Sequence, residues 1–189
     1  MPFVRLGHVG AVVATIAFAA AASAEPVPAP DTESRVFGDW TYRCARIPGA
    51  DTGERTLCEV AQEMAVQEDG RPLPVLTLAL APGPDGSAEY RLTAVAPLGL
   101  RLAPGLSIAV DGGETAAFDF LYCDARGCWV EAPANEDLVA RFKAGRTGQA
   151  RYVLLDGRGL TIEFSLAGFT AALAALDAGL VAGPRTATE

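Results

Sequence analysis

The chain has 189 residues, enough for one domain of ordinary size or two small ones. Half of its residues are hydrophobic and 20% are charged, which excludes disorder along the whole chain and a collagen-like or coiled-coil rod. The formal net charge is −8 at pH 7. An acidic chain repels phosphate backbones, so we expect no nucleic-acid partner.

Residues 1–24 have the pattern of a secretory signal peptide. Arg5 precedes an apolar run from Val9 to Ala22, and Ala22-Ser23-Ala24 matches an A-x-A cleavage site. The run is shorter than the roughly 20 residues that a transmembrane helix needs. The residue directly after the cleavage site is Glu25 and not the cysteine of a lipoprotein. We therefore expect an exported protein, periplasmic or at the outer surface, with no membrane span after cleavage.

The remaining chain is predicted to hold one domain. Residues 25–34 are rich in proline and alanine, which is typical of an extended tether, and residues 183–189 are expected to be a flexible tail. Between them, residues 35–182 contain no internal repeat and no linker, so a single domain is predicted there.

The only histidine, His8, lies in the segment expected to be removed. Imidazole is the commonest general base near neutral pH and the commonest metal ligand. Its loss excludes Ser-His-Asp, Cys-His and histidine-based metal sites from the mature chain. The one lysine, Lys143, is not part of an S-x-x-K motif, and phosphate-binding and calcium-binding loop motifs are absent from the sequence. We expect no enzymatic activity, no catalytic residue, no metal and no cofactor.

Carboxylates leave one enzymatic alternative open. Four of them lie at alternating strand positions, where exposure to solvent is the simpler explanation: Asp111, Asp119, Glu131 and Glu163. Only two carboxyl groups facing each other across a cleft would favour an enzyme that works with carboxylates alone.

Four cysteines remain in the mature chain, and an even number in an exported protein predicts two disulfides. Cys123 and Cys128 bracket Asp124–Gly127, a turn-like segment between alternating runs, so a hairpin would place them opposite each other. Cys44 and Cys58 bracket a polar loop in the same way. We therefore pair neighbours, 44 with 58 and 123 with 128. A zinc site or a redox dithiol is disfavoured because C-x₂-C spacings are absent.

Alternation with a period of two dominates the mature sequence. Apolar residues alternate with polar ones in short runs, for example Trp40, Tyr42 and Cys44. Turn signals such as Asp69-Gly70 and Asp156-Gly157 separate these runs. The pattern predicts an all-β-dominated antiparallel β-sandwich of the immunoglobulin-like kind.

Two segments have helical periodicity instead. Asn135 can cap a short helix over residues 136–144, which Gly145 ends. Near the C-terminus, apolar residues recur at i, i+3, i+4, i+7 and i+11, which predicts an amphipathic helix packed on the sheet: Phe169, Ala172, Leu173, Leu176 and Leu180.

A candidate partner surface comes from one aromatic residue and several basic ones. Trp129 follows Cys128 near the tip of the predicted hairpin, where it can serve as an interface anchor or pack against the disulfide. The basic residues can mark an anionic partner, or they can serve a helix end and a hairpin edge: Arg126, Arg141, Lys143, Arg146 and Arg151.

An ordered set of motifs resembles the invasion-associated locus B family of bacterial exported proteins. The resemblance covers about residues 35–181. It rests on five pieces: Phe37-Gly38-Asp39-Trp40 with Cys44 and then Cys58, Pro97-Leu98-Gly99-Leu100 with Gly105, Cys123 with Gly127-Cys128, the helix Leu138–Gly145 ending in Lys-x-Gly, and Ser165-Leu166-Ala167-Gly168-Phe169.

The resemblance implies a β-sandwich in the periplasm or at the outer surface, associated in pathogens with the invasion of host cells. It carries over no catalytic residue, because its motif positions are glycine, proline, cysteine and aromatic. The expected function is therefore contact with an unidentified protein in the envelope or on a host surface. The alternative is a periplasmic module that binds a small ligand or a glycan.

Overall fold

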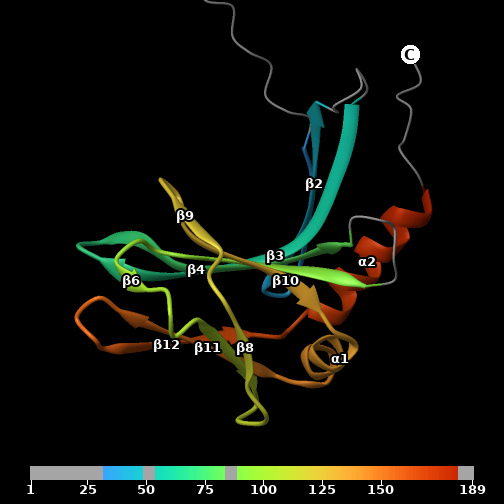
Figure 1. Ribbon diagram of the computed structural model, residues 1–189. Coiled ribbons are helices and arrows are strands. Elements are labelled where there is room, and N and C mark those ends of the chain that lie inside the picture. The colour runs from blue at the N-terminus through green and yellow to red at the C-terminus, as the bar shows by residue number, and fades with distance from the viewer. Residues whose placement is uncertain (1–31, 49–53, 84–88, 183–189) are drawn as a thin grey trace, which may run out of the picture.

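The computed structural model describes residues 32–48, 54–83 and 89–182, which form two antiparallel sheets and two helices (Figure 1). In chain order the elements are β1 (Thr32–Phe37), β2 (Trp40–Pro48), β3 (Glu54–Glu68), β4 (Arg71–Pro82), β5 (Tyr90–Ala96), β6 (Leu100–Arg101), β7 (Leu106–Val110), β8 (Ala116–Phe118), β9 (Tyr122–Asp124), β10 (Gly127–Ala134), α1 (Glu136–Ala144), β11 (Thr147–Leu154), β12 (Gly159–Ser165) and α2 (Phe169–Ala182).

The larger sheet has seven strands in the order β1-β2-β3-β4-β5-β10-β9, so its first five strands form a meander. The smaller sheet has five strands, in the order β12-β11-β7-β8 with β6 paired to β11. All pairings within both sheets are antiparallel. The antiparallel sandwich with a short helix and a C-terminal helix, predicted from the alternating pattern, is confirmed.

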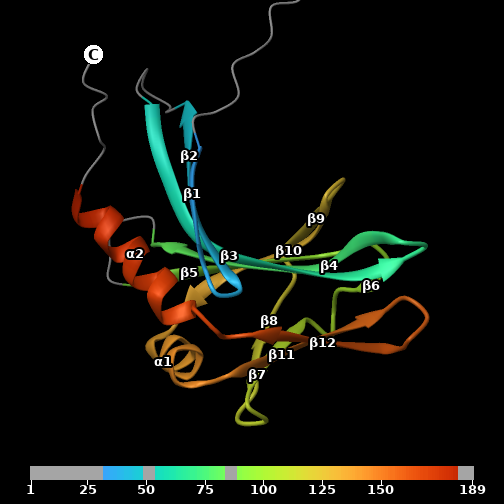
Figure 2. The ribbon, with the colours of Figure 1, turned by 180° about the vertical axis from the view of Figure 1, so that it is seen from behind.

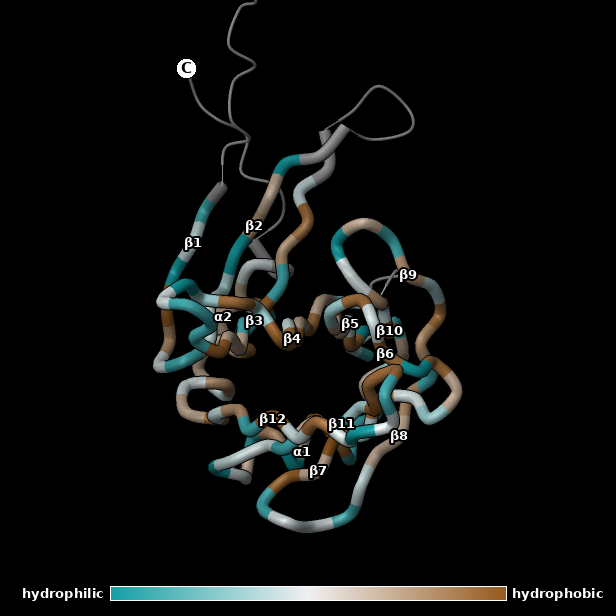
Figure 3. Tube along the Cα trace, turned by 90° about the vertical axis from the view of Figure 1, so that its left-hand side faces the viewer, coloured by the Kyte–Doolittle hydropathy of each residue, from teal (hydrophilic) through white to brown (hydrophobic). Residues whose placement is uncertain are grey.

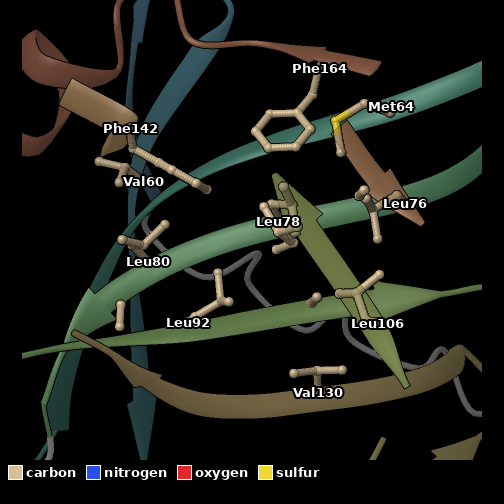
Figure 4. Close-up of a cluster of buried hydrophobic side chains, with 14 of the residues drawn as sticks. Val60, Met64, Leu76, Leu78, Leu80, Leu92, Leu106, Val130, Phe142 and Phe164 are labelled. Carbon is tan, nitrogen blue, oxygen red and sulfur yellow. The ribbon is translucent and has the colours of Figure 1, made fainter. Parts of the chain in front are cut away.

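The core lies between the two sheets because the alternating apolar residues all point inward. Leu78, Leu80 and Leu92 from the larger sheet are fully buried, and Ile108 and Phe164 from the smaller sheet pack in the same cluster. Figure 4 shows side chains of both sheets meeting there. The opposite residues of each strand face outward, so each sheet also presents an outer face.

The helix α1 closes one end of the space between the sheets. The Asn135 side chain accepts a hydrogen bond from the Leu138 backbone N–H at 2.9 Å, as the capping pattern predicts. Gly145 ends the helix with φ −81°, which any residue adopts. The reason for a glycine there is space, since a Cβ would overlap Val110 and would lie 3.0 Å from Leu166 Cδ1.

The helix α2 packs against β1, β2, β3 and α1, on the same side of the molecule as α1 (Figure 2). Phe169, Leu173 and Leu176 are fully buried, and Phe169 meets the Trp40 ring edge-on at 4.9 Å between centroids. The predicted packing of this helix on the sheet is therefore confirmed. The helix covers the inner face of β2 and β3 and leaves their outer face open.

The start of β1 corrects one expected boundary. The tether expected over residues 25–34 is too long, because residues 32–34 pair with β2 as the first residues of β1. Arg35 and Phe37 lie directly opposite Tyr42 and Trp40, and the exposed Arg35 guanidinium lies over the Tyr42 ring at 4.7 Å, which favours the pairing. The expected signal peptide (1–24), the rest of the tether and the tail (183–189) lie outside the described residues.

Candidate functional site

Both disulfides join residues that lie directly opposite each other on neighbouring antiparallel strands. Cys44 on β2 is bonded to Cys58 on β3, and Cys123 on β9 is bonded to Cys128 on β10, which are the pairs expected from the sequence. The Tyr42 hydroxyl lies 2.9 Å from Cys44 Sγ. The β9–β10 connection is tighter than expected, because strand pairing continues to Asp124 and Gly127 and only two residues form the turn.

The six residues of the expected partner surface do not come together. Trp129 and Arg126 lie at the β9–β10 hairpin, on the outer face of the seven-stranded sheet. Arg151 faces outward from β11 in the other sheet, where it is paired in register with Thr161 and Ser107. The predicted set is therefore divided between the two opposite faces of the sandwich and the end of α1.

The remaining basic residues gather at the end of α1, where they serve local structure. Arg141 donates a hydrogen bond to the Glu114 carbonyl at 2.7 Å, and the backbone N–H groups of Arg146 and Thr147 donate to Asp111. These two N–H groups lower the pKa of Asp111. Lys143 is exposed in the last turn of α1, where a cation favours the helix dipole.

Trp129 is held rigidly at the edge of the outer face by three neighbours. Its ring stacks on Tyr122 at 6.0 Å between centroids, and the Arg126 guanidinium lies 4.6 Å from the ring centroid. Its indole N–H donates a hydrogen bond to Asp124 Oδ1 at 3.0 Å. A half-buried tryptophan fixed in this way loses little conformational freedom on binding, which is a property of interface anchors.

Asp124 is the centre of these contacts. The Trp129 indole N–H and the Arg126 backbone N–H both donate to its carboxylate, and the Arg126 guanidinium lies within 3.2 Å of it. These interactions stabilise the charged form and lower the pKa of Asp124 to about 2. Asp124 is therefore ionised at neutral pH and cannot act as a general acid there.

A groove of about 680 Å³ runs along the outer face beside Trp129. Figure 3 shows β2 and β3 rising on one side of β4 and β5, and the β9 hairpin rising on the other. Apart from Trp129, the lining residues are Thr41, Arg43, Ala61, Glu63, Leu73, Pro74, Leu76, Thr77, Val95, Ala96, Pro97, Leu98, Ala125 and Arg126.

Strand register explains the shape of this groove. Trp129, Val95, Thr77 and Glu63 lie directly opposite one another on β10, β5, β4 and β3, and they form one row across the sheet. The middle of the row has small side chains and its two ends have large ones. The next row is smaller still, with Thr93, Ala79 and Ala61 in register.

Exposed apolar residues continue from one end of the groove. Of the large hydrophobic side chains that are exposed in the described residues, five come from the hairpins and loops at the end opposite the helices: Val66, Leu73, Leu98, Leu102 and Leu155. Two of these five, Leu73 and Leu98, line the groove itself. Exposed apolar side chains gathered at one end of a molecule are typical of a binding site.

The sequence pattern did not identify Glu63, Leu98 and Tyr122 as site residues. Each looks ordinary in the sequence: Glu63 and Tyr122 take part in alternating runs, and Leu98 lies in a turn. Their place in the site depends on which strands are neighbours. The outward position of Glu63 in an alternating strand was readable, but its alignment with Trp129 requires the β3-β4-β5-β10 order.

The described residues contain no group of three or more histidine, cysteine, aspartate or glutamate side chains that could hold a metal ion. Two tyrosines away from the groove have raised pKa values for structural reasons. Burial raises the pKa of Tyr152 to about 12, and its hydroxyl donates to the Val75 carbonyl at 2.9 Å. Burial and the Asp177 carboxylate raise the pKa of Tyr90. Neither lies in the groove.

The family described as Invasion associated locus B (IalB) protein matches residues 40–177, which is most of the chain and includes both disulfides. The chain belongs to this family. The expected resemblance is thereby confirmed.

Relatives of the IalB family member described here agree with this assignment. The chain is 28% identical over 148 residues to the invasion protein B homologues of Brucella abortus strain 2308 and of Brucella abortus biovar 1 strain 9-941. The alignment covers 78% of this chain and 80% of each relative. A crystal structure of invasion associated protein B from Bartonella henselae has the same fold, with a TM-score of 0.63 at 21% identity, covering 77% of this chain and 96% of that chain.

The family name indicates a role related to invasion, and two disulfides fit a protein of an oxidising compartment. Between Thr32 and Ala182, in the parts that are described, no helix of this IalB family member is long and apolar enough to cross a membrane.

Proposed function

We propose that this protein is exported, has no enzymatic activity, and acts by binding another protein in a process related to the invasion of host cells. The groove beside Trp129 is the proposed contact surface. The observation that carries this proposal is the fixed position of Trp129, because a preorganised aromatic side chain at the border of an open groove is typical of a binding hot spot.

Several features support protein contact over catalysis. The groove is shallow and its floor consists of small side chains such as Val95 and Thr77. Its charged side chains include Arg126 and Arg43, which are paired with Asp124 and Glu59. Such paired charges fit the polar rim of an interface.

Cross-linking in living cells tests the proposal. A photo-reactive amino acid replaces Leu98 in the groove or, as a control, Thr161 on the outer face of the other sheet. We expect a protein adduct from position 98 that is lost when Trp129→Ala is added, and no such adduct from position 161. Equal adducts at both positions, or none at either, would contradict the proposal.

The alternative, a module that binds a small ligand or a glycan, has one observation in its favour. The stacked Tyr122–Trp129 pair lies beside the carboxylates of Asp124 and Glu131. Aromatic rings beside polar groups can hold a sugar. A screen of oligosaccharides by thermal shift decides this, since a ligand of the folded state raises the melting temperature.

A further inference from the structure

We infer that the groove binds an amphipathic α-helix of a partner protein, with an apolar face on the floor and a lysine or arginine beside Glu63. This inference rests on the proposed function and deepens it by naming the shape and charge of the partner segment. The width of the groove, the size of its floor residues and the charge at its border each support it.

The width fits a helix. Trp129 and Glu63 end one row across four adjacent strands, and three strand spacings place their Cα atoms about 14 Å apart. An α-helix with its side chains is about 10–12 Å in diameter, so it can lie between these borders and touch both. A single extended segment is narrower, because neighbouring strands lie only about 5 Å apart.

The floor allows a helix to approach closely. Val95 and Thr77 occupy the middle of the first row, and Ala79 and Ala61 the middle of the second. No long side chain rises from these four positions. Larger lining residues lie at the borders of the groove: Trp129 and Arg126 at the β9–β10 side, Arg43 and Glu63 on β2 and β3, and Leu73 and Leu98 near the end.

The charge at the border specifies a basic residue. Glu63 is exposed, and within residues 32–48, 54–83 and 89–182 no basic side chain forms an ion pair with it. The other charged residues that line the groove, Arg43 and Arg126, already pair with carboxylates. A cationic side chain of the partner can therefore form an ion pair with Glu63, and the net charge of −8 favours the approach of a basic segment.

The borders also fix where the apolar face of the partner lies. Leu73 is 43% exposed and Leu98 is 57% exposed. Leu98 belongs to the turn after β5, and Leu73 lies at the same end of the groove. A helix that runs along β4 and β5 places its apolar residues on these leucines and on Trp129. This is the helix-in-groove mode, in which residues at i, i+3, i+4 and i+7 are the anchors.

A peptide display library tests the inference. The purified mature chain, with both disulfides formed, selects from fourteen-residue helical peptides that keep an apolar stripe and vary at the border positions. We expect enrichment of lysine or arginine at one border. For a selected peptide, a central proline should weaken binding at least tenfold, and replacement of its basic residue by glutamate should do the same.

Variants of the protein locate the site. Glu63→Gln should reduce the ratio of affinities for the lysine and glutamate peptides at least tenfold. Glu163→Gln, on the outer face of the other sheet, should leave this ratio unchanged. Thr77→Trp fills the floor with an uncharged side chain while Trp129 is retained, and it should weaken binding at least tenfold, as should Trp129→Ala. Circular dichroism melting shows that each variant is folded.

Three results would overturn the inference: selected peptides without a basic preference, undiminished binding after insertion of proline, or self-association of the chain through this groove in sedimentation experiments. If no helical peptide binds but the cross-link at position 98 still depends on Trp129, the inference of a helical partner segment is wrong and the proposed function stands. If that cross-link also fails, both proposals fail.

Discussion

The Trp40 indole N–H donates a hydrogen bond to the Ser165 carbonyl at 3.0 Å, across 125 positions of the sequence. Trp40 begins β2 in one sheet and Ser165 ends β12 in the other, so this bond joins the two layers of the sandwich. The ring itself is completely buried and contacts Phe142 and Phe169. One side chain thus connects both sheets and both helices.

Trp40→Phe is expected to lower the free energy of unfolding by about 2–3 kcal/mol. The substitution leaves a cavity and removes the donor to a part-buried carbonyl, and both effects are destabilising. Urea unfolding followed by circular dichroism measures the change. The control is Tyr122→Phe, which removes a hydroxyl from an exposed ring and should cost less than about 0.5 kcal/mol. Equal effects of the two variants would show that Trp40 does not connect the layers energetically.

The two disulfides should differ in their contribution to stability. Cys44 and Cys58 are 14 residues apart, and Cys123 and Cys128 are 5 apart. Because a longer closed loop restricts the unfolded chain more, the double serine variant at 44 and 58 should lose about 3 kcal/mol and the one at 123 and 128 about 2 kcal/mol. Thermal melting of both variants, with and without reductant, tests this order. A melting temperature of the unsubstituted protein that does not respond to reductant would contradict the expected stabilisation.

Gly168 should not tolerate a side chain. Its φ is +87°, and a Cβ would overlap the carbonyl group of Phe37 in the neighbouring turn. Gly168→Ala should therefore lower the free energy of unfolding by more than about 3 kcal/mol. Gly70 provides a matched control, since its φ is +75° but nothing lies within 4 Å of a Cβ there. Gly70→Ala should cost about 1 kcal/mol. The difference between the two variants measures the clash separately from the backbone strain.

Acid should weaken the β9–β10 hairpin through Asp124. The Trp129 indole N–H, followed by the Arg126 backbone N–H, lowers its pKa to about 2 in the folded state, against about 3.9 in an unfolded chain. The stabilisation from the charged carboxylate is therefore fully present above about pH 4 and is lost as the pH falls toward 2. NMR titration of the Asp124 carboxyl carbon measures the pKa directly. Trp129→Phe should raise this pKa toward its usual range, and no change in the variant would refute the assigned cause.

The alternation of apolar residues was sufficient to predict the sandwich, because strands such as β5, β7 and β11 alternate buried and more exposed residues. Both helices were also readable, since Asn135 and the spacing from Phe169 onward are local signals. The boundary at residue 35 was wrong because β1 depends on pairing with β2 and on the contact of Arg35 with Tyr42, neither of which is a local signal.

The candidate surface was predicted only in part. Trp129 and Arg126 could be selected from their place beside the turn at Cys128, and they do lie on an open face. Arg141 and Arg146 looked equivalent to them in the sequence, but they meet the β7–β8 turn at Glu114 and Asp111. Distinguishing the two groups requires the order of the strands, which pairs β10 with β5 across a long connection.

That placement of β10 beside β5 also decides when the molecule can fold. The meander from β1 to β5 needs only neighbouring segments, but its next strand begins at Gly127, and the second sheet is incomplete until β12 ends at Ser165. During synthesis the inner face of the meander stays uncovered until nearly the entire chain has emerged. The nascent protein therefore exposes apolar surface for a long interval, in which chaperones can hold it.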